Sequence, residues 1–260
     1  MPPLPISVCL IAGAEAQRIR RPLESVSGWT GEIIVVLNQE VGDGTDRIAQ
    51  SFGAKVFREP WKGYVGQKNS AVQKAAGEWI LSLDADEAVS PALRDELQGR
   101  FSRPEKLRPL AALSFPRCTF YGGRWIRHGD WYPDRKVRLW RRGSAEWRGE
   151  NVHETVAVQG AVGKCRNDLL HYSMDDLNHH VRKAVRYSDL FAQSRRETAA
   201  GVLALGFRPW WRFVRGYFLR LGFLDGWQGF VIARMVAFET FLRYAKVREA
   251  QTRDADQPRP

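Results

Sequence analysis

The first third of the chain alternates between short apolar runs and polar segments that place apolar residues at helical intervals. Residues 6–12 (ISVCLIA) and 32–38 (EIIVVLN) are nearly continuous apolar runs, and the second is rich in β-branched side chains, as in buried parallel strands. Residues 54–60 and 78–86 predict a third and a fourth strand. Repeated units of one strand and one helix predict a doubly wound α/β sheet, which binds its ligands at the carboxyl ends of its parallel strands.

The segments between these strands have the spacing of helices, which are expected over residues 15–29, 44–54, 69–77 and 92–100. Ser90 and Pro91 form the pattern of an N-cap and a first-turn proline before the last of these helices. Gly77 is expected to end the third, because glycine commonly follows a helix. Residues 111–121 and 136–142 predict two further strands, joined by loops rich in Gly, Trp and Arg.

From Asp175 onward the pattern is helical. Residues 208–249 interleave large aromatic residues with arginine, and two interpretations stay open. The aromatic residues form a core where helices cover the sheet, or they form a surface that attaches to an anionic membrane. We expect three parts: a nucleotide-sugar-binding and catalytic domain over residues 1–174, a helical region for acceptor and membrane-surface association over 175–249, and a flexible tail over 250–260.

Charge and composition narrow the class of protein. The net charge of +11 points to anionic partners, namely nucleic acid, a lipid surface or phosphorylated substrates. A hydrophobic content of 44% with 27% charged residues is typical of a folded chain and argues against disorder. The three cysteines are far apart and form no CxxC motif, which indicates a reducing compartment. No uncharged apolar run approaches the ~20 residues that span a bilayer, so we do not expect the chain to be integral to a membrane by that route.

Three carboxylates, Asp84, Asp86 and Glu87, follow the apolar residues 79–83 at the end of the fourth predicted strand. Carboxylates this close repel one another and resist desolvation, so positive charge is expected to compensate them. Oxygen ligands suit Mg²⁺ or Mn²⁺, which commonly bridge carboxylates and substrate phosphates. The alternative is a solvated junction between strand and loop, because an Asp-x-Asp pair alone is common.

Longer segments resemble family 2 glycosyltransferases of the GT-A fold. They are ISVCLIAGAE, GEIIVV with DGT, WKGYVGQKNSAVQKAAGEWILSLDADEAVSPAL, and VRLWRRG with NVHE. The GQKN and LDADE segments are the specific part, and the resemblance extends to about residue 249. The branch that the chain resembles is the β-1,4-glucosyltransferase type of the bacterial lipopolysaccharide core, which also has a helical C-terminus. The resemblance implies a Rossmann-like, mostly parallel mixed sheet with flanking helices and a helical C-terminal extension.

The resemblance also implies an activity. It is the inverting transfer of a hexose, with glucose from UDP-glucose as the first candidate, to a lipopolysaccharide-core or related glycolipid. A Mg²⁺ or Mn²⁺ ion held by Asp84 and Asp86 would neutralise the departing diphosphate as a Lewis acid. His171 or His153 would complete the metal shell, although a lone histidine is more often a packed or hydrogen-bonded residue. The expected partners are the nucleotide sugar, the glycolipid and an anionic membrane surface at the inner face of the cytoplasmic membrane, and no nucleic acid is expected.

The resemblance gives the following candidates for substrate binding: Glu15, Asn38, Lys68, Asn69, Asp84, Ala85, Trp131 and His153. Glu15 is expected in the nucleoside pocket, although an acid at a helix start is also favoured by the helix dipole. Lys68 is expected at the phosphates or the base. The family usually has an aspartate after the second strand, contacting the uracil edge. Asn38 stands in that region here, so the donor base is open.

An inverting transferase needs a general base for the acceptor hydroxyl, and the candidates are Asp130, Asp134, Glu150 and Glu154. Glu154, within Val152-His153-Glu154, falls where related enzymes carry their base and is the first choice. Asp130 is the second.

Two other functions remain as alternatives. A single-stranded nucleic-acid-binding protein would use the basic, Trp-rich middle of the chain, but it leaves the three carboxylates unexplained. A nucleotidyltransferase would share the metal, but it normally has a glycine-rich basic segment after the first strand, and AGAEAQRIR is not such a segment.

Overall fold

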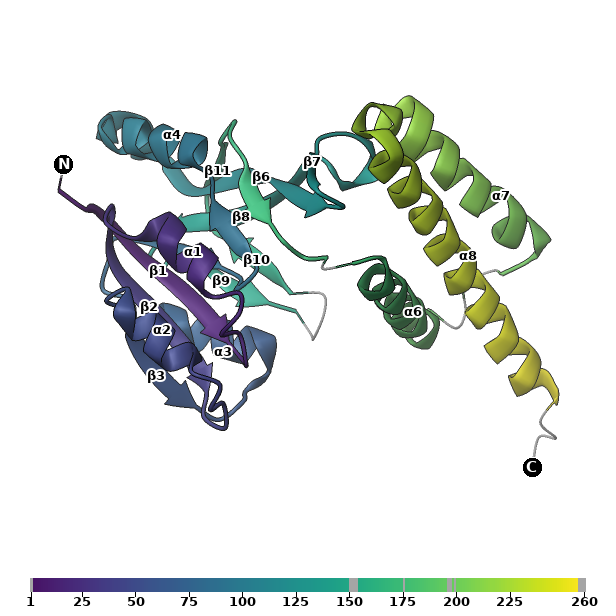
Figure 1. Ribbon diagram of the computed structural model, residues 1–260, viewed down its shortest axis with the longest axis horizontal. Coiled ribbons are helices and arrows are strands. Elements are labelled where there is room, and N and C mark those ends of the chain that lie inside the picture. The colour runs from purple at the N-terminus through teal and green to yellow at the C-terminus, as the bar shows by residue number, and fades with distance from the viewer. Residues whose placement is uncertain (1, 150–153, 175, 196–197, 199, 257–260) are drawn as a thin grey trace. The chain divides into compact units, whose positions relative to one another are not determined.

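The computed structural model describes residues 2–149, 154–174, 176–195, 198 and 200–256 (Figure 1). The chain forms two compact units, which are described separately. Unit 1 comprises the residues up to Arg117 together with Asp134–His171, and unit 2 comprises Cys118–Pro133 with the residues from Tyr172 onward. Compactness therefore groups residues 118–133 with the C-terminal helices, whereas the sequence alone suggested a boundary at residue 174.

Unit 1 is built on a mixed β-sheet with the strand order β3-β2-β1-β4-β8-β6-β12-β5. Its parallel half consists of the four strands expected from the sequence: β1 (Leu4–Ala12), β2 (Thr30–Asn38), β3 (Lys55–Glu59) and β4 (Trp79–Leu83). The other half begins where β8 (Asp134–Arg141) pairs antiparallel with β4, and β6 (Leu110–Tyr121) pairs antiparallel with β8. The short strands β5 (Glu87–Val89) and β12 (Leu169–His171) also pair antiparallel. The mixed sheet expected from the sequence is confirmed.

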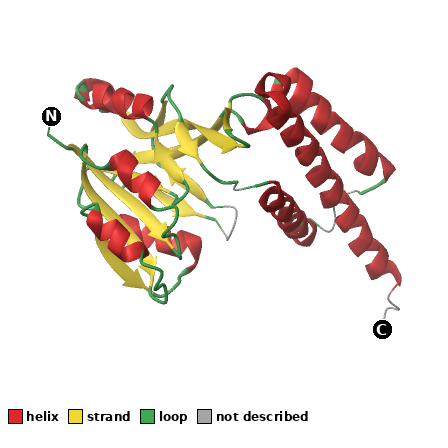
Figure 2. Cartoon of the chain, viewed as in Figure 1, coloured by secondary structure: helices red, strands yellow, loops and turns green. Residues whose placement is uncertain are grey.

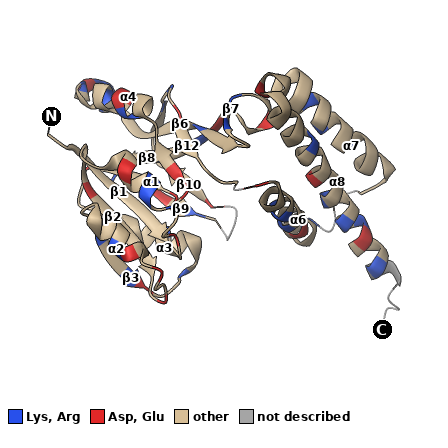
Figure 3. Cartoon of the chain, in the orientation of Figure 1, with Lys and Arg blue, Asp and Glu red and all other residues tan. Residues whose placement is uncertain are grey.

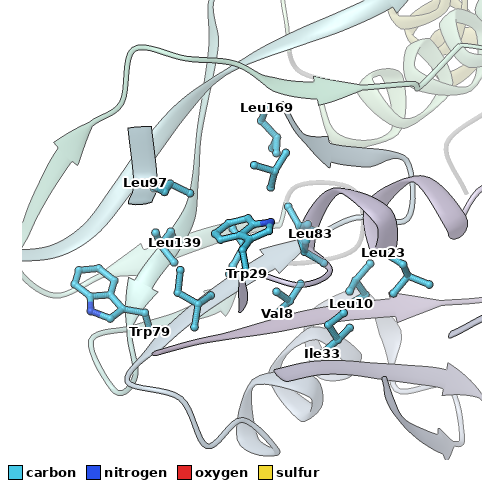
Figure 4. Packing of buried hydrophobic residues seen from close by; sticks show 14 of the residues in the cluster. Val8, Leu10, Leu23, Trp29, Ile33, Trp79, Leu83, Leu97, Leu139 and Leu169 are labelled. Atoms are coloured by element: carbon cyan, nitrogen blue, oxygen red, sulfur yellow. The ribbon is translucent and has the colours of Figure 1, made fainter. Parts of the chain in front are cut away.

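Alternate residues of the central strands face two different hydrophobic clusters. Val8 and Leu10 of β1 belong to one cluster together with Leu83 and Leu139 (Figure 4), whereas Cys9 belongs to the other. Because successive side chains of a strand point to opposite faces, burial of both faces requires the continuous apolar runs seen in the sequence.

The helices of unit 1 are α1 (Arg20–Val26), α2 (Thr45–Ser51), α3 (Gly63–Gln73), α4 (Pro91–Phe101) and α5 (Pro104–Leu107). The expected cap of α4 is confirmed, because Ser90 Oγ accepts a hydrogen bond from the Leu93 amide at 3.1 Å. α1 is shorter than expected, because residues 16–19 and 27–29 form turns on either side of it.

The expected end of a helix at Gly77 is wrong. α3 ends at Gln73, and Gly77 lies against β1, where a Cβ atom would be 2.6 Å from Ser7 Oγ. The glycine is required for this close approach of two backbones and not as a helix terminator.

Three further strands complete unit 1. β9 (Ala145–Arg148) and β10 (Thr155–Val158) form a separate antiparallel ribbon, and β11 (Ala161–Lys164) pairs parallel with β6. Trp147 of β9 is buried in the second hydrophobic cluster, so the ribbon packs on the same face as Cys9.

Unit 2 is mainly helical after residue 172 (Figure 2). It contains α6 (Leu177–Ser194), α7 (Val202–Val214), the π-helical turn η3 (Arg215–Leu219), the 3₁₀ turn η4 (Gly222–Asp225) and α8 (Gly226–Asp256), besides β7 (Arg124–Ile126) and the 3₁₀ turn η1 (Gly129–Trp131). Helices α7 and α8 lie side by side (Figure 1). Residues 250–256, expected within the tail, continue α8. Within the described residues, the helices are too short or too polar to cross a membrane.

Candidate active site at the carboxyl end of β4

The acidic segment expected at a strand end lies there. β4 ends at Leu83, and Asp84–Asp86 follow at the edge where the parallel strands β1 and β2 also end. Glu87 begins β5 and is fully buried. Carboxylates at this edge occupy the position where doubly wound sheets bind ligands.

Arginines of the chain supply much of the positive charge that these carboxylates require. One Nη atom of Arg138, on β8, lies 2.6 Å from Asp84 Oδ2 and 2.8 Å from Glu87 Oε1, and Arg138 Nε donates to Glu87 Oε2 at 2.8 Å. Arg117 adds a hydrogen bond to Glu87 at 3.3 Å. Sequence reasoning did not identify Arg138. The sequence feature that could have identified it is an arginine at an inward position of the predicted strand over residues 136–142.

Lys68 joins two expected site residues that are distant in sequence. Its Nζ lies 2.7 Å from Asp84 Oδ1 and 2.6 Å from Glu154 Oε1, and its side chain is only 4% exposed. The same ammonium group lies 4.1 Å from the centre of the Trp147 ring. Glu154 Oε2 is buried and has no hydrogen-bond partner among the described residues. The side chain as a whole is 20% exposed, and a carboxylate oxygen that makes no other hydrogen bond is available to accept a proton.

The charges around Asp84 favour its ionised form. Burial alone would raise the pKa of Asp84, but Arg138 and Lys68 outweigh that effect and hold its pKa below the ordinary value. Burial would lower the pKa of the Arg138 guanidinium, but Glu87 and Asp84 outweigh that effect and raise it above the ordinary value. Asp84 is therefore a carboxylate at neutral pH.

Asp86 faces a different partner from Asp84. Its Oδ2 lies 3.5 Å from Nε2 of His171, the last residue of β12. Burial would raise the pKa of Asp86, but His171 outweighs it, and the pKa lies below the ordinary value. The structure thus brings together the expected donors Asp86 and His171, while Asp84 is held by cations of the chain.

This donor set fits a metal ion that is bound jointly with a substrate. The side chains described here contain no group of three or more His, Cys, Asp or Glu residues arranged to hold an ion. A carboxylate and an imidazole that face each other nevertheless suit Mn²⁺ or Mg²⁺, which often take one or two protein ligands and complete their shell with phosphate oxygens and water. His153 and Glu150 lie outside the described residues.

A cavity of about 470 Å³ opens at the carboxyl end of β1, and the residues that line it are Ala14, Glu15, Ala16, Gln17, Arg18 and Asp43. Asp43 shapes it. One carboxylate oxygen accepts from the Ala16 amide at 3.0 Å, and the other accepts from Thr45 Oγ1 at 2.6 Å. The hydrogen bonds from Thr45 contribute most to a lowered pKa of Asp43.

The cavity contains one expected residue and one that was missed. Glu15 lines it as expected, whereas Asn38 ends β2 and is not among the lining residues. Asp43 was not identified, although an aspartate before Gly44 and Thr45 at a helix start was a usable signal.

The remaining expected residues have other surroundings. The Asn69 side chain exchanges two hydrogen bonds with the Trp147 backbone, at 2.9 and 3.0 Å, and so fixes β9 to α3. Ala85 is half-buried between the two aspartates. Asp134, a further candidate base, is bonded to Arg117 at 2.6 Å.

Asp130 and Trp131 belong to unit 2. Trp131 contacts the rings of Tyr121 and His180, with centroids 5.4 and 5.1 Å apart. The Asp130 carboxylate is surrounded by three guanidinium groups at 2.9–3.3 Å, those of Arg212, Arg215 and Arg220.

Comparisons with known proteins agree with this geometry. The family model described as "Glycosyl transferase family 2" matches residues 7–164. An uncharacterized glycosyltransferase of Rickettsia typhi is 34% identical, over 94% of this chain and 87% of the relative. The lipopolysaccharide core biosynthesis glycosyltransferase LpsC of Rhizobium meliloti is 30% identical, over 95% of this chain and 93% of the relative.

Two solved structures share the fold. The mannosyltransferase PcManGT of Pyrobaculum calidifontis, in complex with GDP-Man and Mn²⁺, has a TM-score of 0.50 at 15% identity, covering 98% of this chain and 90% of that one. Residues 1–349 of S. aureus TarS, in complex with UDP-GlcNAc, have a TM-score of 0.50 at 12% identity, covering 98% and 93%. Identity this low supports the fold alone, which is of the GT-A type. Together with the family model and the two relatives, these observations identify the chain as a member of glycosyl transferase family 2.

Proposed function

We propose that the protein transfers a hexose from a nucleotide sugar to a lipopolysaccharide-core or related glycolipid, with inversion at the anomeric carbon. UDP-glucose is the first candidate for the donor. The observation that carries the proposal is the position of Lys68, which contacts both Asp84 at the expected donor site and the carboxylate of Glu154. The similarity to the R. meliloti lipopolysaccharide core enzyme supports the acceptor class.

In this proposal the donor occupies the carboxyl edge of the parallel strands. The nucleoside enters the cavity beside Glu15 and Asp43, and the diphosphate lies near Lys68. A Mg²⁺ or Mn²⁺ ion held by Asp86 and His171, and by Asp84 if Lys68 or Arg138 releases it, would neutralise charge on the diphosphate. Cations already in place around a departing diphosphate lower the barrier, because they need no reorganisation during the reaction.

Glu154 serves as the general base. Its Oε2 accepts the proton of the acceptor hydroxyl while that oxygen forms the new bond to the anomeric carbon and the bond from that carbon to the diphosphate oxygen breaks. Lys68 donates to the other carboxylate oxygen at 2.6 Å and keeps the group oriented. Asp130 suits the role less well, because three arginines already share its carboxylate.

A glycolipid acceptor implies that the protein works at the inner face of the cytoplasmic membrane and associates with it peripherally. Binding of nucleic acid is less favoured, because the basic residues of the middle segment are largely engaged by acids of the chain. Arg117 and Lys136 pair with Asp134, and Arg148 pairs with Glu146.

Transfer assays with UDP-glucose, UDP-galactose and GDP-mannose test the proposal, with a soluble core oligosaccharide as acceptor and Mn²⁺ present. Release of nucleoside diphosphate and a β-linked product by NMR are expected. Asp84→Asn should abolish transfer, whereas the matched control Asp95→Asn, at an exposed acid of α4, should not. An α-linked product would refute inversion. If no donor is bound or turned over, and wild type and Asp84→Asn behave alike, the site is not a donor site.

A further inference from the structure

The turn between α7 and α8 directs large apolar side chains into solvent. Leu219, Leu221, Phe223, Leu224 and Trp227 are each between 44% and 63% exposed. Turns between helices in water are usually made of glycine, asparagine, aspartate and serine. The turn here has the opposite composition, with its large apolar side chains in solvent.

The one acidic residue of this turn is buried. Asp225 is 1% exposed, and its carboxylate accepts hydrogen bonds from the amides of Arg127 and His128 at 3.0 and 2.8 Å. Leu221 has a φ of 59° and is the single non-glycine residue with positive φ in the described part of the chain. A strained leucine with an exposed side chain is costly, and such costs are typically retained where a surface has a task.

Helix α7 continues this surface. Leu203, Phe207, Trp210 and Trp211 recur at helical spacing along one side of α7, and each is at least 42% exposed. The rings of Phe207 and Trp211 stack on each other while remaining open to solvent. In Figure 3, α7 is mostly uncharged, whereas α8 carries residues of both signs. We call the exposed apolar residues of 202–230 the aromatic surface.

Positive charge accompanies the aromatic surface. Residues 202–230 contain four arginines and one acid, the buried Asp225. Arg212, Arg215 and Arg220 converge on the single carboxylate of Asp130, and their side chains stay 31–44% exposed. Three guanidinium groups around one carboxylate leave an excess of positive charge and unused donors, which suit phosphate oxygens.

We propose that the aromatic surface docks on a bilayer of anionic phospholipids, with its apolar side chains at the boundary between headgroups and acyl chains and its arginines at the phosphates. Exposed aromatic residues next to arginine are the chemistry of interfacial attachment, and anionic headgroups attract each nearby basic residue. This proposal names the surface responsible for the peripheral association proposed above, and it does not depend on glycosyl transfer.

A second copy of the chain is a poorer occupant. A symmetric dimer would place the same patch of both copies face to face, and their arginines would repel each other. The core of a protein interface is usually depleted of charge, whereas this surface has charged groups beside its apolar residues.

Vesicle flotation tests the proposal with the full-length protein. Vesicles of phosphatidylcholine are compared with vesicles that also contain about 30% phosphatidylglycerol, at low and at high salt. Binding is expected on the anionic vesicles alone and should weaken with salt.

Phe223→Ser should reduce the partition coefficient at least about fivefold, because it removes an apolar ring from the interface. The matched control Phe241→Ser, at a ring of α8 with nearly the same exposure (42% against 44%), should bind like wild type. Arg212→Gln should also cost about fivefold, which corresponds to about 1 kcal/mol.

Three results would overturn the proposal. The first is that the protein does not float with anionic vesicles. The second is that Phe223→Ser and Phe241→Ser lose binding equally. The third is that the protein forms a stable dimer that Phe223→Ser dissociates. An assay of sugar transfer to a water-soluble acceptor separates membrane docking from glycosyl transfer. Phe223→Ser should retain transfer to this acceptor. An absence of transfer in wild type would count against the proposed function alone.

Discussion

Lys68 Nζ lies 2.6 Å from Glu154 Oε1, although the two residues are 86 positions apart in the sequence. The same Nζ lies 2.7 Å from Asp84. One buried cation therefore connects the strand end expected to face the donor with the carboxylate expected to face the acceptor. Because the ammonium group is nearly excluded from water, these contacts are stronger than similar pairs at the surface.

Replacing this cation should impair transfer strongly. Lys68→Met keeps the length of the side chain but leaves Glu154 without its partner, so kcat/KM should fall about 10²–10³-fold, as when a preorganised charge is removed from an active site. Steady-state kinetics with the nucleotide sugar measure this effect. Lys74→Met is the matched control, because Lys74 follows the same helix and pairs with Glu59 away from Asp84. Equal activity of the two variants would show that Lys68 has only a structural role.

Glu154→Gln should separate chemistry from donor binding. The amide keeps the shape and the hydrogen bond but cannot take the proton, so kcat should fall roughly 10²–10⁴-fold while the donor Kd changes little. Glu146→Gln, at an exposed acid of the same ribbon, should keep normal kcat. If Glu154→Gln turns over normally and Asp130→Asn is inactive, Asp130 is the base.

The effect of Mn²⁺ on UDP binding should require Asp86 and His171. Calorimetry of UDP binding to wild type should show higher affinity with Mn²⁺ than without it, and Asp86→Asn should lose that difference because the ion loses a carboxylate ligand. His171→Gln should reduce the difference without abolishing it. The metal role fails if wild type and Asp86→Asn bind UDP equally with and without Mn²⁺.

Glu32 should stabilise unit 1 in a pH-dependent manner. Burial would raise the pKa of Glu32, but Lys55, Ser7 and the Ala76 amide outweigh it and lower the pKa from 4.5 to about 2. A folded pKa below the unfolded one gives stability that is present above about pH 5 and is lost as the pH falls toward 2. Glu32→Gln should therefore lower the free energy of unfolding at neutral pH by about 1–3 kcal/mol, with the difference vanishing near pH 2.

Urea unfolding across this pH range measures the effect. Glu24→Gln, at an exposed acid that lies 3.8 Å from Arg20, should change stability little at any pH. A Glu32→Gln deficit that persists unchanged at pH 2 would contradict ionisation as its cause.

Gly77→Ala should destabilise the protein by about 1–3 kcal/mol, because the new methyl group would lie 2.6 Å from Ser7 Oγ and 2.8 Å from the Ser7 amide. Gly99→Ala, inside α4 with no atom within 4 Å of its Cβ, should be stabilising by about 0.4–1 kcal/mol. Thermal unfolding of both variants decides the matter, and similar melting temperatures would contradict the packing argument.

The sequence by itself determined the parallel half of the sheet and the edge where the acids lie. Apolar runs, the Ser90 cap and the break after Leu83 are local patterns, and local patterns encode strands and helix starts because burial and capping act over a few residues.

Only the tertiary structure decided what compensates the acids. Arg138 comes from β8, 54 residues after Asp84, and it reaches Asp84 and Glu87 because β8 pairs antiparallel with β4. Pairing of this kind depends on the register of strands distant in sequence, which no local spacing specifies. The surroundings of Asp130, a candidate base in the sequence, are likewise set by residues distant in sequence, namely the arginines of unit 2.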